Sequence, residues 1–296
     1  MKNLIKTNHV KALALLVALS CTGANAGIVV NFGGQGATDG SGLTSNLVNA
    51  NNLQDTASGV FIETFDIATA MTDLGGLVPG GFGPADTSFN YNDADTDANA
   101  AGCGVNTLGA AGIGISTTGG GFGVTIGNQP GVAANPGNGN TDVPSIEDNT
   151  CFGFTPASGS SGTVTIDYSG FLAGLGGGVL IDYFGFYWGS VDDYNDFTFF
   201  DSTTGTSETL LGSTLLALQA GSPGNQANPS SNAYVNITFN GGFAFDSVRV
   251  NSTGIAGEFD NVVTGLNNRP SVPEPASLAI FGLGLIGLAL TKRKAK

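Results

Sequence analysis

The 296-residue sequence is 41% apolar but only 11% charged, well below the roughly 25% of charged residues in an ordinary soluble domain. Most of the missing charge is basic, because residues 27–271 contain 22 carboxylates, two arginines and no lysine, a formal charge of −20. Such a chain repels nucleic acid and anionic lipid and attracts divalent cations. We therefore exclude nucleic acid as a partner.

The first 26 residues are typical of an export signal. A basic start with three lysines precedes the apolar run at residues 12–20, and Ala24 and Ala26 supply the small residues that signal peptidase requires. We predict cleavage by signal peptidase, so that the mature chain begins at Gly27. A lipidated Cys21 is the alternative, but the leucine usual three positions before such a cysteine is missing.

Cleavage would also remove His9, the only histidine of the sequence. A mature chain without His, and without Lys before its last few residues, has no imidazole base, no His zinc ligand and no Schiff-base or P-loop lysine. A glycosidase needs only two carboxylates about 5 to 10 Å apart in a cleft, but 22 acids produce such pairs by chance. We therefore expect a protein that is not an enzyme.

Two cysteines remain in the mature chain, Cys103 and Cys151. In an oxidising compartment a pair is more often bridged than free, and the spacing is unlike that of zinc sites. We predict a disulfide. Two separate buried thiols are the alternative.

Alternating apolar and polar residues, bounded by Gly, Asn or Pro, predict short strands along the body. The predicted strands are residues 27–32, 59–66, 87–91, 121–127, 162–168, 179–189, 196–201, 233–239 and 243–250. Stretches rich in Gly, Asn, Pro and Ser at residues 33–58, 128–150 and 219–232 predict long surface loops. No apolar stretch keeps helical spacing for three turns. The pattern predicts one all-β domain over residues 27–271, a jelly-roll-like β-sandwich with long Gly/Asn-rich loops.

Aromatic residues of two predicted strands are expected to form the centre of the sandwich. They are Tyr183, Phe184, Phe186, Tyr187, Trp188, Phe197, Phe199 and Phe200.

The C-terminal segment differs from the rest of the chain. Residues 276–290 are apolar except for Ser277, and as a helix they would span about 22 Å against a hydrocarbon core of about 30 Å. We predict a transmembrane helix that is short for a permanent anchor. The basic tip at Lys292, Arg293 and Lys294 predicts a cytoplasmic C-terminus with the acidic body in the periplasm.

Pro273, Glu274 and Pro275, followed by the short apolar run and the basic tip, resemble a PEP-CTERM sorting signal. The resemblance covers residues 272–296 and implies that the protein is a substrate of exosortase, a membrane protease of Gram-negative bacteria that produce exopolysaccharide. It also implies an inner-membrane intermediate, processing near the Pro-Glu-Pro motif, and release or transfer to the cell surface or extracellular matrix.

Residues 179–264 resemble the recurring segments of one subgroup of exosortase-dependent surface proteins. This resemblance implies that the second half is part of one sandwich module whose last strand holds Glu258, Phe259 and Asp260. It implies no biochemical activity.

Two groups of acidic residues are candidates for binding a metal ion. Asp93, Asp95 and Asp97 alternate along one loop, but alanine stands at the glycine position of an EF-hand, and a solvated acidic loop is the simpler interpretation. The second set resembles the structural calcium site of carbohydrate-binding jelly rolls, and its residues are Glu63, Asp66, Glu258 and Asp260. A structural calcium ion at this second set is our hypothesis. We expect no other cofactor.

The function we expect is that of an exported, non-enzymatic protein of the cell surface or exopolysaccharide matrix. The alternative is a carbohydrate-binding module in which an exposed Tyr187, Trp188 or Tyr194 stacks on sugar rings of that polysaccharide. Core packing is the competing role for these aromatic residues, and we favour it for Trp188 because its segment is apolar nearly throughout.

Overall fold

The computed structural model describes residues 27–53, 59–66, 103, 113–139, 146–176, 178–220 and 223–268. Several predicted features lie outside the described residues: the export signal, the strand at 87–91, the acidic loop at 93–97, the Pro-Glu-Pro motif, the helix at 276–290 and the basic tip.

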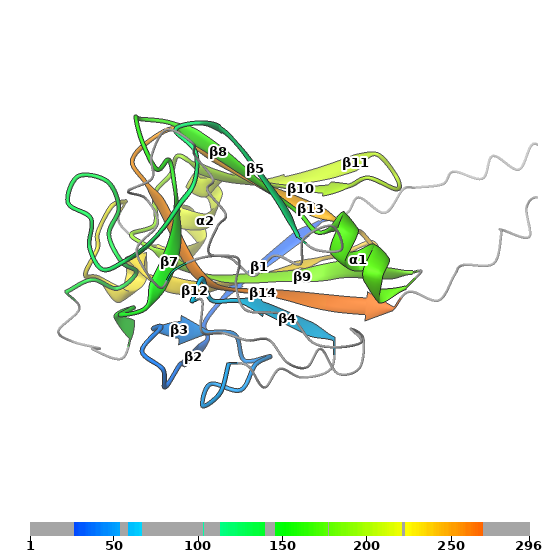
Figure 1. Ribbon diagram of the computed structural model, residues 1–296, viewed down its shortest axis with the longest axis horizontal. Coiled ribbons are helices and arrows are strands. Elements are labelled where there is room, and N and C mark those ends of the chain that lie inside the picture. Colours follow the sequence, from blue (N-terminus) through cyan, green and yellow to red (C-terminus); the bar gives the residue numbers. More distant parts are fainter. Residues whose placement is uncertain are drawn as a thin grey trace, which may run out of the picture.

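Within the described residues the chain forms two facing antiparallel sheets, which confirms the prediction of an all-β sandwich (Figure 1). The seven-stranded first sheet has the order β1-β12-β9-β14-β7-β6, with β4 also paired to β14, and the five-stranded second sheet has the order β11-β10-β13-β8-β5. The first sheet contains β1 (Ile28–Phe32), β4 (Val60–Glu63), β6 (Gly123–Ile126), β7 (Cys151–Thr155), β9 (Val179–Gly189), β12 (Ala233–Phe239) and β14 (Gly257–Asn268). The second contains β5 (Gly114–Gly119), β8 (Gly162–Asp167), β10 (Asn195–Asp201), β11 (Thr206–Leu210) and β13 (Ser247–Ser252).

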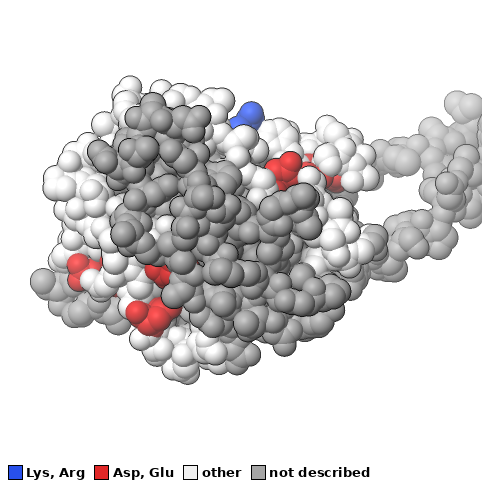
Figure 2. Space-filling view, viewed as in Figure 1, with Lys and Arg blue, Asp and Glu red and all other residues white. Residues whose placement is uncertain are grey.

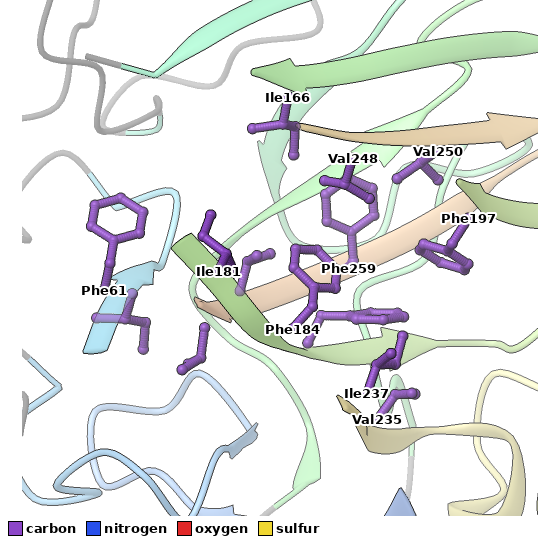
Figure 3. Close-up of a cluster of buried hydrophobic side chains, with 14 of the residues drawn as sticks. Phe61, Ile166, Ile181, Phe184, Phe197, Val235, Ile237, Val248, Val250 and Phe259 are labelled. Carbon is purple, nitrogen blue, oxygen red and sulfur yellow. The ribbon is translucent and has the colours of Figure 1, made fainter. Parts of the chain in front are cut away.

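The core between the sheets follows from the two-residue period of the strands. On β9, Phe184, Phe186 and Trp188 point toward β10, where Phe197 lies 4.8 Å from Phe186 and 5.7 Å from Trp188, centre to centre. Phe199 lies 5.5 Å from Phe184 in an edge-to-face arrangement. Figure 3 shows side chains of both sheets interdigitating in this layer. The predicted aromatic centre therefore forms, with the exceptions described next.

The alternate residues of β9 point to the other side of the first sheet, where loops cover them. Tyr187 donates a hydrogen bond to the carbonyl of Ile146, and Tyr183 shares one with Ser45 at 2.8 Å. Tyr187 and Tyr183 are thus buried beneath loops rather than between the sheets. Phe200 is half-buried on the outer side of the second sheet, where Arg249 stands over its ring.

The covering loops contain regular structure that the sequence patterns do not predict. A small hairpin of β2 (Gln35–Gly36) and β3 (Leu43–Thr44) lies in the first predicted loop, and the 3-10 turn η4 (Pro229–Ser231) lies in the third. The β2–β3 hairpin contacts β9 and β12 and makes a third layer on one face of the first sheet, whereas η4 contacts α2.

The sequence patterns also do not predict two short helices, α1 (Ser169–Leu175) and α2 (Gly212–Gln219). Both have fewer than three turns, so hydrophobic periodicity has little room to appear. Across the described ranges, no helix has the length and apolar character to pass through a membrane.

Candidate functional site

The candidate site is centred on an irregularity in β14. Asp260 pairs with Tyr187 and Val263 pairs with Gly185, so three residues of β14 are matched to two of β9. The extra residue, Asn261, has a positive φ of 47°, a conformation that Asn tolerates better than most residues. The bulge also falls between two partners on the other edge of β14, because β7 pairs with it up to Phe259 and β4 pairs from Val262 onward.

Asn261 is fixed by the loop that covers the sheet. Its amide nitrogen donates hydrogen bonds to the carbonyl and hydroxyl of Ser41, both at 2.9 Å, and to the carbonyl of Leu43 at 3.0 Å. The hydroxyl of Ser41 in turn donates to Asp39, and its backbone forms a β-bridge with Asp148. These contacts bring together three segments of the chain: residues 39–41, residue 148 and residues 260–261.

The segment that ends at Asp66 also lies beside these residues, because Asp66 contacts both cysteines of the disulfide. The structure joins Cys103 and Cys151, which are 48 residues apart, with Cα atoms 5.6 Å apart. Asp66 pairs with Cys103 in a β-bridge and accepts a hydrogen bond from the Cys151 N–H at 3.1 Å. We call Asp39, Asp66, Asp148 and Asp260 the acidic cluster.

Burial governs the ionisation of the acidic cluster. It raises the pKa of Asp66 to about 6 and that of Asp148 to about 7. For Asp148, hydrogen bonds from the N–H and hydroxyl of Thr150 oppose the shift, and the charge of Asp66 adds to it. For Asp260, burial and then the charges of Asp148 and Asp66 raise the pKa well above its usual range. The charges of Asp148 and Asp66 thus add to burial in making Asp260 harder to ionise.

The four residues predicted to bind calcium do not lie together in the structure; they are found at three separate places. Asp66 and Asp260 meet in the acidic cluster. Glu63 accepts a hydrogen bond from the Phe65 N–H at 2.7 Å. Glu258 accepts from the Ala134 N–H at 3.1 Å and from the Ser190 hydroxyl at 2.9 Å, which places it in the pocket described next. Across the described residues, no three His, Cys, Asp or Glu side chains form a group able to hold a metal ion.

The pocket beside Glu258 has a volume of about 280 Å³ and is lined by residues 128–134 together with Asp192 and Tyr194. Burial raises the pKa of Glu258 to about 8 and that of Asp192 to about 6. The Tyr194 hydroxyl donates to Asp192 at 2.6 Å. The carboxylates of this acidic pocket are thus engaged in holding neighbouring segments together.

A second hollow lies on the outer face of the second sheet and has a volume of about 370 Å³. Its lining side chains are Thr118, Thr163, Thr165, Asp196, Thr198, Thr209, Arg249 and Asn251. We call this hollow the threonine groove. Arg249 is the only basic residue in the described ranges. In the view of Figure 2, basic colour is confined to one small area at the upper edge, whereas acidic residues form several separate patches.

Two of the three aromatic residues proposed for sugar stacking are unsuited to it. Tyr187 and Trp188 are 0% and 1% exposed, so the alternative that they stack on sugar rings is wrong, and the core role favoured for Trp188 is confirmed. Tyr194 lines the acidic pocket with its ring packed on Gly254.

Sequence patterns alone miss Asp148, Asn261 and Arg249 as site residues. Asp148 stands in a predicted loop, and Asn261 follows a strand residue with nothing to mark a bulge. Arg249 could have been noticed from the sequence, because it is one of only two basic residues between positions 27 and 271.

Comparison with known proteins finds no match among curated proteins or solved structures. A family model does match the C-terminal segment, the PEP-CTERM protein-sorting motif at residues 271–294. This match agrees with the resemblance of Pro273, Glu274 and Pro275. The C-terminal segment of the chain therefore carries a PEP-CTERM protein-sorting motif, the motif of exported proteins that are directed to exosortase.

Proposed function

We propose that this protein is a non-enzymatic component of the cell surface or exopolysaccharide matrix. The sorting motif at residues 271–294 is the observation that supports this most directly, because it addresses the acidic sandwich to the cell exterior. The export-signal pattern of residues 1–26 is consistent with the same route. Signal peptidase and exosortase are the processing enzymes in this proposal.

The chemistry of the body favours a structural role over catalysis. The described residues include no His and no Lys, and their two cysteines are joined to each other. The remaining acid–base candidates, Asp192 and Glu258, are occupied by hydrogen bonds that anchor Tyr194, Ser190 and the loop at Ala134. This arrangement uses both carboxylates to hold loops in place.

The sorting step is tested in the producing bacterium with Glu274→Ala, which alters the centre of the motif. We expect a larger form that stays with the membrane fraction, measured by cell fractionation and intact mass. Ser277→Ala leaves the Pro-Glu-Pro residues unchanged and serves as the matched control. An unchanged mass and location of the Glu274→Ala protein would contradict the proposal.

A carbohydrate-binding role is the second candidate, and the threonine groove favours it. Its hydroxyl groups and the Asn251 amide stand on paired strands, so their positions are held by the sheet, as Thr163 and Asn251 are by a 2.9 Å hydrogen bond. Arg249 adds a cation suited to the carboxylate of an acidic sugar.

The carbohydrate-binding role is tested by glycan-array binding of the secreted protein and its Arg249→Gln variant. We expect at least about tenfold weaker binding of an acidic glycan by the variant, with an unchanged melting midpoint. Thr238→Ala, an exposed change on the first sheet, is the control. No glycan binding by the wild type, or equal binding by Arg249→Gln, would exclude this site.

A further inference from the structure

The acidic cluster contains oxygen atoms that the described structure leaves without partners. Both carboxylate oxygens of Asp260, Oδ2 of Asp148 and Oδ1 of Asn261 are buried and have no hydrogen-bond partner of normal geometry. All three residues are 0% exposed. A buried polar atom without a partner costs about 1 to 3 kcal/mol, and more when it is charged.

Each of these atoms is an acceptor, and the described donors of Thr150 and of the Asn261 side chain bond to other atoms. The N–H and hydroxyl of Thr150 both donate to Oδ1 of Asp148 at 2.8 Å, on the opposite side of the carboxylate from Oδ2. The amide nitrogen of Asn261 donates to Ser41 and Leu43, and its amide oxygen is buried without a hydrogen-bond partner in the described structure. The buried oxygens of Asp148, Asp260 and Asn261 therefore need a proton or a cation that these donors do not provide.

No side chain of the described residues supplies that charge. Arg249 is their only base, and its guanidinium lies 4.8 Å from the ring centre of Phe200 on the second sheet, whereas Asp260 belongs to the first. Protons or a metal cation are the remaining sources of neutralisation.

We propose that Asp148, Asp260 and the amide oxygen of Asn261 form a binding site for a calcium ion. Asp66 is close enough to Asp260 to influence its ionisation, so its carboxylate adds favourable charge beside the ion. Two carboxylates and one amide form the site, so it does not require the group of three acidic, His or Cys side chains that the described residues lack.

The chemistry of these ligands selects calcium among common divalent cations. All of them are oxygen atoms, which Ca²⁺ and Mg²⁺ prefer and which zinc and copper sites rarely use alone. Mg²⁺ usually keeps several of its water molecules, whereas Ca²⁺ accepts carboxylate and amide oxygens in irregular arrangements. Because Asp148 and Asp260 are fully buried, the site has little room for a hydrated ion.

Calcium would tie together segments that are distant in the sequence. The ligands come from the loop before β7 and from the bulge of β14, and Ser41 joins them to the covering layer. The ion would therefore act as a cross-link between the first sheet and its loops. This role is independent of the sorting function and of sugar binding in the threonine groove.

The test uses the secreted protein, stripped with EDTA and dialysed. Addition of about 1 mM Ca²⁺, a typical concentration for extracellular calcium modules, should raise the melting midpoint by several degrees. About 1 mM Mg²⁺ should raise it much less. No response to Ca²⁺, or an equal response to Mg²⁺, overturns the assignment.

Asp260→Asn and Asp148→Asn identify the site, because each removes one charge without changing the shape of the side chain. Both variants should lose the calcium-dependent rise, and their midpoints in EDTA should equal or exceed that of the wild type because a buried charge has been removed. Asp193→Asn, an exposed change in the loop after β9, should respond to calcium as the wild type does. A full calcium response in Asp260→Asn would overturn the proposal.

Terbium provides a readout that does not depend on stability. Burial, and then the nearby charges of Asp148 and Asp260, raise the pKa of Tyr187. This tyrosine is therefore placed to sensitise the luminescence of Tb³⁺ bound in place of Ca²⁺. Wild-type protein should show this luminescence, and Ca²⁺ should displace it. Asp260→Asn should bind Tb³⁺ about tenfold or more weakly. Equal titration curves for the two proteins would overturn the proposal even if their midpoints differ.

Discussion

Asp192 illustrates how a single carboxylate couples stability to pH. It is 5% exposed, and burial raises its pKa to about 6, assisted by the charge of Asp193 and opposed by hydrogen bonding to Tyr194 and Gly224. The folded state therefore holds a proton that the unfolded chain releases near pH 4. Because the folded state binds more protons between about pH 4 and pH 6, its stability falls as the pH rises through this range.

We predict that Asp192→Asn removes this loss. The variant should match the wild type near pH 4 and be more stable near pH 7.5 by about 1 to 2 kcal/mol, after allowance for solvent screening. Urea unfolding at both pH values, in EDTA, measures the difference. A difference for Asp192→Asn of the same size at both pH values would contradict the assigned cause.

At the scale of elements, β9 determines how the third layer fits. Its outer face alternates Tyr183, Gly185, Tyr187 and Gly189, so that loops can approach the backbone between the rings. A Cβ atom on Gly185 would meet the hydroxyl of Tyr234 at 2.8 Å and that of Tyr183 still closer. The glycines thus leave the volume that the covering loops and tyrosine hydroxyls need.

We therefore expect Gly185→Ala to destabilise the protein by about 1 to 3 kcal/mol, as overpacking in a filled interior does. The matched control is Gly114→Ala in β5, where the added methyl group would come no nearer than 3.7 Å to Asp167. Chemical denaturation of both variants gives the comparison. Equal midpoints would show that the outer face of β9 has spare room.

At the scale of the whole molecule, the distribution of charge dominates. The body has a formal charge of −20, and its described residues contain one base, so Coulomb repulsion opposes the compact state. The disulfide acts in the opposite direction, since closing a loop of 48 residues stabilises the fold by about 4 kcal/mol in the chain-entropy model.

Salt should stabilise this protein even without calcium. Raising NaCl from about 10 mM to about 300 mM shortens the screening length, and the melting midpoint in EDTA should rise by a few degrees. Choline chloride at equal ionic strength should give the same rise, because screening does not depend on the identity of the cation. A rise seen with only one of the salts would point to specific ion binding instead.

Much of the sandwich was predictable because strand patterns are local. The strands β8, β9 and β12 lie almost where their alternating residues place them, and the aromatic residues of β9 and β10 meet as expected. The strands β7, β11 and most of β14 were not recognised from their patterns, because they are short or buried on both faces and so lack alternation.

The sequence by itself determined the route of the protein and the character of its body. The Pro-Glu-Pro motif, the apolar run and the basic tip are read as linear signals, and the acidic, lysine-free composition does not depend on the fold. Only the tertiary structure decided which carboxylates meet. Asp66, Asp148 and Asp260 are far apart in the chain, and they converge because the bulge at Asn261 falls where β4 ends and β7 begins. Pairing between strands that are distant in the sequence determines where the bulge lies relative to β4 and β7, and no local sequence pattern specifies this position.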